Sequence, residues 1–226
     1  MAAFPLMLPG TSRPPKLVVF DLDHTLIACD ATILWTEFLY EKKIVTDPIW
    51  RQYDRDMVKS YAKGVLDIRD FCRKHSGAFR SIPEEKLHAL AQEFAKKKIA
   101  PLIFPDGKKW AKNALQANIP ACVLSASAAF IVKPIAKLFG LTDAMGIELA
   151  FKDGFCTGEI VGIPTFQEGK VERLSERLAE AGIGFEDVLF FTDSRNDLPL
   201  AERAGYTVCV NPDAVLESAA RKNGWK

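Results

Sequence analysis

The sequence is poor in the residues that most often bind transition metals, and it has no excess of charge. Its 226 residues include three histidines and five cysteines, and the formal net charge is +1. The cysteines are odd in number and contain no Cys-x-x-Cys pair, which argues against a zinc site or a disulfide framework and indicates a reducing, cytoplasmic setting. A net charge near zero gives no overall field for nucleic acid or for an anionic membrane.

Long apolar runs are also missing. No stretch approaches the length of a membrane span. Residues 1–15 contain four prolines and no early positive charge, so they lack the pattern of a signal peptide. We expect this segment to be a flexible N-terminal arm.

What the sequence does contain is an alternation of strand-like and helix-like segments. Apolar runs at residues 16–22, 119–125, 188–192 and 206–210 predict strands, and amphipathic stretches between them predict helices. This order is typical of an α/β protein with a Rossmann-like three-layer α/β/α core and a parallel sheet. Residues 147–161 alternate around a turn and predict a hairpin.

The long interval after the first strand has only helical spacing. We therefore expect a helical cap domain at residues 31–99, inserted after the first strand, and an α/β catalytic core at residues 16–30 and 100–226. An insertion beside a strand end is well placed to act as a lid.

The first strand ends at two carboxylates, Asp21 and Asp23, and Thr25 follows them. In open α/β sheets, ligands bind at the carboxyl ends of the strands. Two carboxylates this close repel each other unless a cation lies between them, and a set of oxygen ligands suits Mg²⁺. Taken alone, the segment equally fits an ordinary strand followed by an acidic turn.

Three further segments place polar side chains at expected strand ends or helix starts. Ser125 and Ala126 precede a helix whose N-terminus would bind an anion, although a turn or N-cap serine is the plainer interpretation. Lys170 lies at a helix start, where it opposes the dipole, although most such lysines are solvated. Asp193 and Asp197 follow another buried strand and repeat the acidic pattern of the first.

In this order, the four segments resemble the haloacid dehalogenase superfamily of hydrolases. The opening DxDxT motif corresponds to residues 21–25, the second-motif hydroxyl to Ser125, the lysine to Lys170, and the acidic fourth motif to Asp193 with Asp197. The helical insertion and the Ser-Ala-Ser sequence are similar to the phosphoserine-phosphatase-like subclass IB, including a subgroup with some histidinol-phosphatases. The resemblance covers nearly the whole chain after residue 15.

The resemblance implies a Mg²⁺-dependent phosphatase that works through an aspartyl-phosphate. Asp21 would be the nucleophile, and Asp23 would protonate the leaving alcohol and then activate water. The cation would be held by the Asp21 side chain, the Asp23 backbone carbonyl and the Asp193 side chain. Asp197 and Thr25 would hold these metal ligands in position without binding the cation themselves.

The resemblance also implies how the substrate is held. Ser125, Ala126 and Lys170 would bind the phosphoryl oxygens, and Asn196 would orient substrate or water. The expected substrate is a small phosphorylated metabolite, similar to phosphoserine or histidinol phosphate. Asp30 stands where phosphoserine phosphatases carry a glutamate that binds the substrate amine, so its shorter reach makes phosphoserine itself a weaker candidate.

Other residues carry secondary expectations. His24 replaces the glycine common at its position, and we expect it to be tolerated in the turn. We expect His75 and His88 on the surface, since neither shows metal-ligand spacing. The cap also contains four cationic side chains that are candidates for contacting the substrate and determining specificity: Arg51, Arg55, Arg69 and Arg73.

Three alternative functions remain open from the sequence. A phosphotransferase or mutase would use an alcohol in place of water and share all four motifs. A metal-dependent glycosyltransferase also uses an Asp-x-Asp, but it gives no role to Lys170 or to the Asp193 segment. A non-catalytic binding module on the same fold is disfavoured by the intact Asp21 and Asp23. The sequence gives no indication of oligomeric state.

Overall fold

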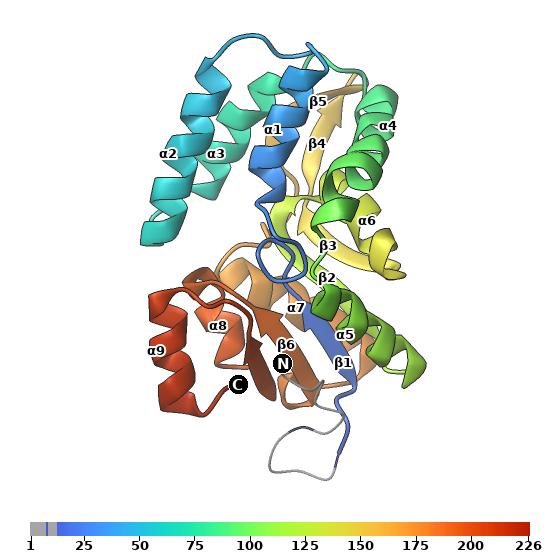
Figure 1. Ribbon diagram of the computed structural model, residues 1–226, viewed down its shortest axis with the longest axis vertical. Coiled ribbons are helices and arrows are strands. Elements are labelled where there is room, and N and C mark those ends of the chain that lie inside the picture. Colours follow the sequence, from blue (N-terminus) through green and yellow to red (C-terminus); the bar gives the residue numbers. More distant parts are fainter. Residues whose placement is uncertain (1–7, 9–12) are drawn as a thin grey trace.

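The computed structural model describes residue 8 and residues 13–226 (Figure 1). The predicted arm at residues 1–15 therefore lies mostly outside the described residues. Within it, Leu8 is buried in the main hydrophobic cluster.

The catalytic core is built on a parallel sheet of five strands in the part of the chain that the structure describes, in the order β3-β2-β1-β6-β7. Every neighbouring pair in this sheet is parallel. The strands are β1 (Leu17–Phe20), β2 (Ala121–Ala128), β3 (Asp143–Ile147), β6 (Val188–Thr192) and β7 (Tyr206–Cys209). The predicted α/β fold with a parallel sheet is confirmed, although the sequence analysis missed β3.

Side chains of β1 alternate between the two faces of the sheet, as a strand buried on both sides requires. Val18 and Phe20 belong to one hydrophobic cluster, whereas Leu17 and Val19 belong to another. The first cluster includes side chains of α5 (Pro105–Gln116) and α6 (Ala129–Ala136), and the second includes those of α7 (Glu168–Ala181) and α8 (Leu198–Ala201). Helices thus cover both faces and form the predicted three layers, and α9 (Ala214–Asn223) lies near β7.

Above the sheet in Figure 1 lie the four helices of the predicted cap. They are α1 (Ala31–Glu41), α2 (Ile49–Lys63), α3 (Ile68–His75) and α4 (Glu84–Phe94). Asp30 and Asp67 accept backbone N–H bonds as N-caps of α1 and α3, and Gly64 ends α2 with φ 72°. Short 3₁₀ or π turns occur at Ser76–Ala78, Ala95–Ile99, Ala100–Leu102, Lys137–Phe139, Phe185–Asp187 and Arg195–Asp197.

Aromatic rings join these helices to the core. Trp35 of α1 is fully buried and meets Phe94 of α4 and Phe130 of α6 edge to face, with ring centroids 5.4 and 5.5 Å apart. Such contacts contribute beyond the area that they bury. Because Phe130 lies on a core helix, the cap is packed onto the core through this cluster.

The predicted hairpin forms a separate two-stranded antiparallel sheet, β4 (Leu149–Lys152) with β5 (Phe155–Ile160). It lies beside the cap helices rather than in the main sheet (Figure 1). The backbone N–H of Glu84 donates to the carbonyl of Gly154 at 2.8 Å, which ties the hairpin to the start of α4. Among the described residues, no helix is long and apolar enough to cross a membrane.

Candidate active site

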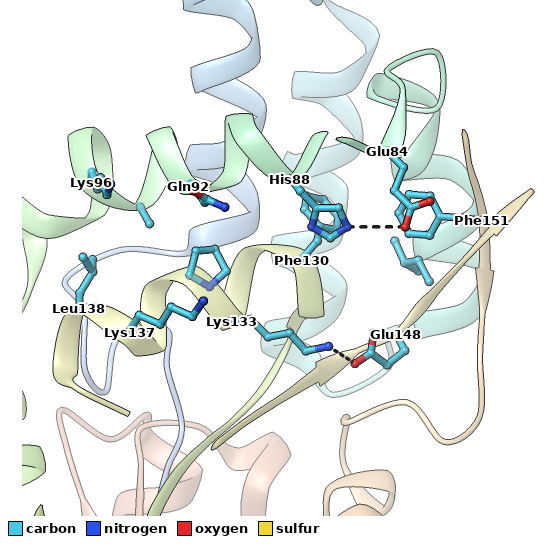
Figure 2. A pocket seen from close by; sticks show the side chains of 13 residues that line it. Glu84, His88, Gln92, Lys96, Phe130, Lys133, Lys137, Leu138, Glu148 and Phe151 are labelled. Carbon is cyan, nitrogen blue, oxygen red and sulfur yellow. Dashed lines mark hydrogen bonds and ion pairs between the residues drawn. The ribbon is translucent and has the colours of Figure 1, made fainter. Parts of the chain in front are cut away.

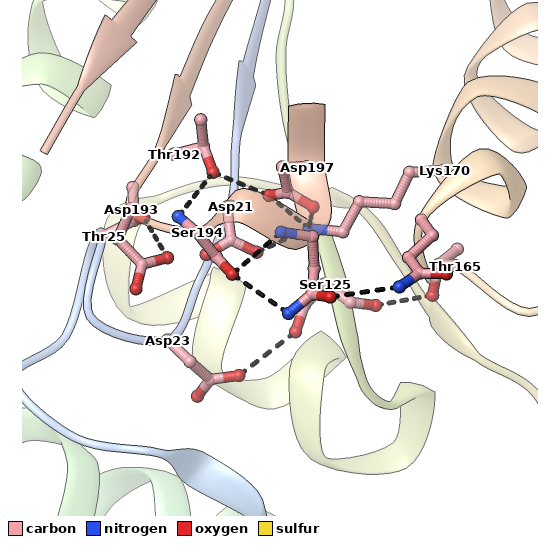
Figure 3. Close-up of polar contacts among 12 residues, drawn as sticks. Asp21, Asp23, Thr25, Ser125, Thr165, Lys170, Thr192, Asp193, Ser194 and Asp197 are labelled. Carbon is pink, nitrogen blue, oxygen red and sulfur yellow. Dashed lines mark hydrogen bonds and ion pairs between the residues drawn. The ribbon is translucent and has the colours of Figure 1, made fainter. Parts of the chain in front are cut away.

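The sheet order brings the acidic strand ends together. Strand β1 lies between β2 and β6, so the carboxyl ends of these three strands are adjacent at one edge of the sheet. Asp21 follows β1, Asp193 follows β6, and Ser125 lies in the last part of β2 (Figure 3). The structure therefore gathers residues that lie far apart in the sequence.

Lys170 is buried among carboxylates rather than solvated. Its side chain is 1% exposed, and its ammonium lies 2.7 Å from Asp21 Oδ1 and 2.8 Å from the Asp197 carboxylate. Burial alone would lower the pKa of Lys170, but the charges of Asp197 and Asp21 outweigh it and raise the pKa above its usual value. Lys170 therefore stays a cation fixed beside Asp21, which explains its placement at the start of α7 despite the helix dipole.

Asp23 is held by donors from both the cap and the core. Its Oδ1 accepts the backbone N–H of Ala31 at 2.7 Å, and its Oδ2 accepts the hydroxyls of Ser127 at 2.9 Å and Ser125 at 3.4 Å. Burial, together with the charges of Asp30 and Asp21, raises the pKa of Asp23 well above its ordinary value. A raised pKa favours the protonated carboxyl group, which is the form that a general acid requires.

The fourth-motif carboxylates differ in their surroundings. Thr192 Oγ1 donates to Asp197 Oδ2 at 2.7 Å, so Asp197 is occupied by Thr192 and Lys170. Among the residues that the structure describes, the Asp193 side chain accepts one hydrogen bond, from the distant hydroxyl of Thr25 at 3.5 Å. Burial and the charges of Asp21 and Asp197 raise the pKa of Asp193 to about 9. In the metal-free protein this shift favours the neutral carboxyl group of Asp193, and a cation bound beside it would favour the carboxylate instead.

This environment fits a hard cation with few protein ligands. No group of three carboxylate, imidazole or thiol side chains in the described part of the chain is arranged as a complete metal cage. Mg²⁺ is commonly bound through one or two carboxylates, with water and substrate phosphate completing the octahedron. The crowded carboxylates of Asp21 and Asp193 meet that requirement, because a cation between them would remove their mutual repulsion.

A cavity of about 210 Å³ opens directly above these carboxylates, between the core and the cap. Its core side includes Asp21, Asp23, Asp193, Ala126 and Ser127. Its cap side is contributed mainly by apolar side chains. These are Ile33, Met57, Val58, Tyr61, Ala62, Leu66, Ile68 and Phe71.

Three further polar side chains, His24, Asp30 and Thr32, line the cavity. Asp30 lines it while its Oδ1 accepts the backbone N–H of Ile33 at 2.9 Å. His24 also lines it, and its φ of 55° lies in the left-handed region that favours glycine. His24 is thus accommodated in the turn and also faces the cavity.

A larger cavity, about 720 Å³, lies between α4 and α6 (Figure 2). Lys133 at its edge is already paired with Glu148 at 2.7 Å. None of the strand-end carboxylates lines it. The smaller cavity is therefore the one lined by the strand-end carboxylates that the sequence predicts to be catalytic.

Known proteins with the same arrangement identify the family. The sequence profile described as haloacid dehalogenase-like hydrolase matches residues 18–202. This chain belongs to the haloacid dehalogenase-like hydrolases. It is 35% identical over 214 residues to a histidinol-phosphatase of Neisseria meningitidis, covering 93% of this chain and 96% of that protein.

Further comparisons agree with this assignment. A Mycobacterium tuberculosis protein named phosphoserine phosphatase is 27% identical, covering 98% of this chain and 75% of its own length. A Bordetella pertussis crystal structure of unknown function superposes with a TM-score of 0.85 at 30% identity, covering 94% of this chain and 97% of that one. A substrate-bound phosphoserine phosphatase gives 0.68 at 22% identity, over 92% and 91% of the two chains, and shares the fold. The chain is a phosphatase of this family.

Within this hydrolase, Asn196 reaches the cap rather than the cavity. Its amide donates to the backbone carbonyl of Tyr61 at 3.1 Å, and its Oδ1 accepts from Gln167 at 3.1 Å. Gln167 also donates to the carbonyl of Gly64 at 3.2 Å. Asn196 and Gln167 thus tie the end of α2 to the catalytic loops, and a contact of Asn196 with substrate stays a prediction.

The four arginines that were expected to contact the substrate do not line the catalytic cavity. Arg51 forms two 2.7 Å bonds with Glu37, and Arg55 contacts Gln52. Arg69 and Arg73 are directed to the hairpin segment, where they meet the carbonyl of Gly162 and the carboxylate of Glu159. The structure therefore does not place these four arginines at this cavity, because the sequence does not show which face of each cap helix turns inward. A contact of any of them with the substrate stays a prediction.

The two cap histidines differ from each other. His75 is 4% exposed and lies 2.9 Å from Thr36 Oγ1, so its predicted surface position is wrong. It follows Phe71 by one helical turn and stacks against that ring. His88 is about half exposed, as predicted.

Several site residues were not expected from the sequence. Strand β2 continues to Ala128 through an irregular register, so Ser125 lies inside the strand rather than directly at the start of α6. Ser127 shares the inward face of β2 with Ser125, a spacing of two that could have indicated it. Thr165 donates to the Ser125 carbonyl at 2.5 Å, and no local pattern pointed to it.

Proposed function

We propose that this phosphatase hydrolyses a small phosphomonoester that carries an amine and no carboxylate, similar to histidinol phosphate. One observation carries the proposal: among the described residues that line the catalytic cavity, none is a lysine or arginine, whereas Asp30 is present. A substrate carboxylate placed there would be desolvated with no lysine or arginine to pair with, and His24, the imidazole in the lining, already interacts with Asp30. An ammonium group would instead be attracted to Asp30.

Cavity size and a relative support the same substrate class. A volume of about 210 Å³ suits a small metabolite, and drug-sized ligands usually need larger sites. The Neisseria meningitidis relative, which aligns over nearly the whole chain, is named a histidinol-phosphatase.

In the proposed reaction, an oxygen of Asp21 forms a bond to phosphorus while the bond from phosphorus to the ester oxygen breaks. Asp23 gives its proton to the departing alcohol. In the second step, the Asp23 carboxylate takes a proton from water, whose oxygen attacks phosphorus. Inorganic phosphate leaves, and the Asp21 carboxylate is restored.

Other side chains hold these groups in place. The hydroxyl of Ser127 fixes one oxygen of Asp23, and Lys170 fixes Asp21 and would neutralise charge on the phosphoryl oxygens. Mg²⁺, when bound by Asp21, Asp193 and the Asp23 carbonyl, would supply further positive charge to the transferring group.

We expect Mg²⁺ to be required for turnover and to stabilise the protein. Excess EDTA should lower hydrolysis of p-nitrophenyl phosphate on the order of 10²-fold or more, and Mg²⁺ should raise Tm by an amount that grows with its concentration. In Asp193→Asn, the Mg²⁺-dependent rise in Tm should disappear, because one of two carboxylate ligands is gone. Full turnover in EDTA, or an unchanged rise in Asp193→Asn, would contradict the proposed cation site.

Two substrates that differ only in a carboxylate group test whether the cavity lacks a cationic side chain that binds this group. O-Phosphoethanolamine should be hydrolysed with a kcat/KM at least about tenfold above that for O-phospho-L-serine, since only the latter buries an unpaired carboxylate. Release of inorganic phosphate measures both rates. A preference for phosphoserine would overturn the proposed substrate class while leaving the phosphatase activity intact.

The role of Asp30 predicts a selective defect. Asp30→Asn keeps an N-cap acceptor for Ile33 but removes the charge. We expect kcat/KM for O-phosphoethanolamine to fall about tenfold relative to that for ethyl phosphate, which lacks the amine. Asp67→Asn, which changes the N-cap of α3 in the same way, is the matched control. An equal loss on both substrates would show that Asp30 acts only on the fold.

A further inference from the structure

The cavity-lining face of α2 continues past the cavity to a second buried carboxylate. Asp54, Met57, Val58 and Tyr61 are spaced by three, one and three residues, so they share one face of the helix. Burial and the charges of Asp197 and Asp21 raise the pKa of Tyr61, which marks the catalytic end of this face. Seven residues of helix place the Cα of Asp54 about 10 Å farther along.

Asp54 is unusual among the charged side chains of the cap. It is 4% exposed, and both carboxylate oxygens are buried without a hydrogen-bond donor among the described residues. His75 Nε2 lies 3.3 Å from Oδ1, but that nitrogen is closer to the hydroxyl of Thr36, at 2.9 Å. A buried carboxylate whose close neighbour His75 is shared with the hydroxyl of Thr36 is costly to maintain, which points to a further group that binds it at some stage.

A hollow beside Asp54 adjoins the catalytic cavity, and the two carboxylate oxygens of Asp54 are covered by neighbouring atoms. The hollow, of about 150 Å³ between α1 and α2, is lined by Asp54 and shares two side chains, Ile33 and Val58, with the catalytic cavity. The cations at this hollow are already engaged, because Arg51 pairs with Glu37 and Arg55 with Gln52. Val58 is 43% exposed, so its side chain is free to rotate out of the passage.

The charge of Asp54 also reaches the proposed amine site. It contributes to the raised pKa of Asp30, although burial is the larger cause. Asp30 lines the catalytic cavity, and Asp54 lines the hollow that shares Ile33 and Val58 with it.

We propose that Asp54 is a specificity-determining residue that accepts an N–H from a second nitrogen of the substrate, beyond the amine bound near Asp30. The substrate is then a phosphorylated amino alcohol whose far end carries an imidazole or another N–H donor. This inference rests on the proposed function, since it needs a phosphomonoester bound at Asp21. Aliphatic or phenyl end groups would fit the apolar walls but leave Asp54 without a donor.

Three substrates separate these contributions. O-Phosphoethanolamine contains the phosphate and the amine; L-histidinol phosphate adds an imidazole; L-phenylalaninol phosphate adds a phenyl ring instead. In the wild type, kcat/KM should be at least about tenfold higher for the imidazole compound than for the phenyl compound. In Asp54→Asn, that ratio should fall toward one, mainly through a higher KM for L-histidinol phosphate.

Two more variants keep the inference testable if Asp54→Asn folds poorly. Val58→Phe narrows the passage to Asp54 from a half-exposed position and should also reduce the imidazole preference. Glu37→Gln is the matched control, because Glu37 lines the same hollow but already has Arg51 as its partner; it should retain the preference.

The outcomes are distinct. Equal kcat/KM on the imidazole and phenyl compounds in the wild type, or an equal loss on all three substrates in Asp54→Asn with Val58→Phe unchanged, would overturn the role of Asp54. Absence of phosphate release from every compound, p-nitrophenyl phosphate included, would instead overturn the proposed function.

Discussion

Asp21→Asn is expected to reduce turnover on every phosphomonoester by on the order of 10⁴-fold or more, because an amide has the shape of a carboxylate but cannot attack phosphorus. Lys170 would still find an oxygen acceptor at this position, so the fold should be kept. The measurement is the rate of inorganic phosphate release under saturating Mg²⁺. Asp153→Asn is the matched control, since Asp153 is exposed at the hairpin turn, where φ is 52° and asparagine is well tolerated.

Stability measured on the same variant tests the electrostatics of the site. Asp21 contributes to the raised pKa of both Asp23 and Asp193, so removing its charge relieves repulsion in the metal-free protein. We expect the Tm of Asp21→Asn in EDTA to be equal to or slightly above that of the wild type. Retained turnover would remove Asp21 as the nucleophile, and a clear drop in Tm would show that its bond to Lys170 outweighs the repulsion.

Lys170→Met should damage both activity and stability. The variant leaves the buried carboxylates of Asp21 and Asp197 without their shared cation, and breaking a buried pair in this way costs about 3–5 kcal/mol. Loss of positive charge at the phosphoryl site should lower kcat about 10²–10³-fold. Lys112→Met, at an exposed position on α5, controls for the loss of a lysine as such.

The stability defect of Lys170→Met should depend on pH in a defined direction. Burial already raises the pKa of Asp197 to about 6, and without Lys170 its pKa rises further. A carboxyl group whose pKa is higher in the folded than in the unfolded state binds more protons when folded, so stability falls as pH rises through that range. The variant should therefore lie closest to the wild type near pH 5 and farthest above pH 7, as measured by urea denaturation in EDTA.

A second substitution checks that assignment. Adding Asp197→Asn to Lys170→Met removes one of the two buried carboxylates that have lost their cation. The double variant should recover part of the lost stability at pH 8. A defect that does not change with pH, or that is not relieved in the double variant, would indicate lost packing of the lysine stem instead.

Much of the core was predictable because it depends on local pattern. The four apolar runs became β1, β2, β6 and β7. Strand β3 was missed because its sequence, Asp-Ala-Met-Gly-Ile, has neither a continuous apolar run nor β-branched residues apart from its last. Pairing with β2 makes it a strand, and pairing is not visible in a local window.

The sequence by itself determined the order of the catalytic groups. Asp21, Ser125 and Asp193 each follow or end an apolar run, and a parallel sheet places such ends together whatever the loops do. Only the tertiary structure decided what surrounds them. It kept Arg51 and Arg55 out of the cavity lining and buried His75 beside Asp54, because the inward face of a cap helix depends on how neighbouring helices pack. Short sequence motifs thus determine the residues of the phosphoryl site, whereas substrate specificity depends on contacts between helices that are distant in the chain.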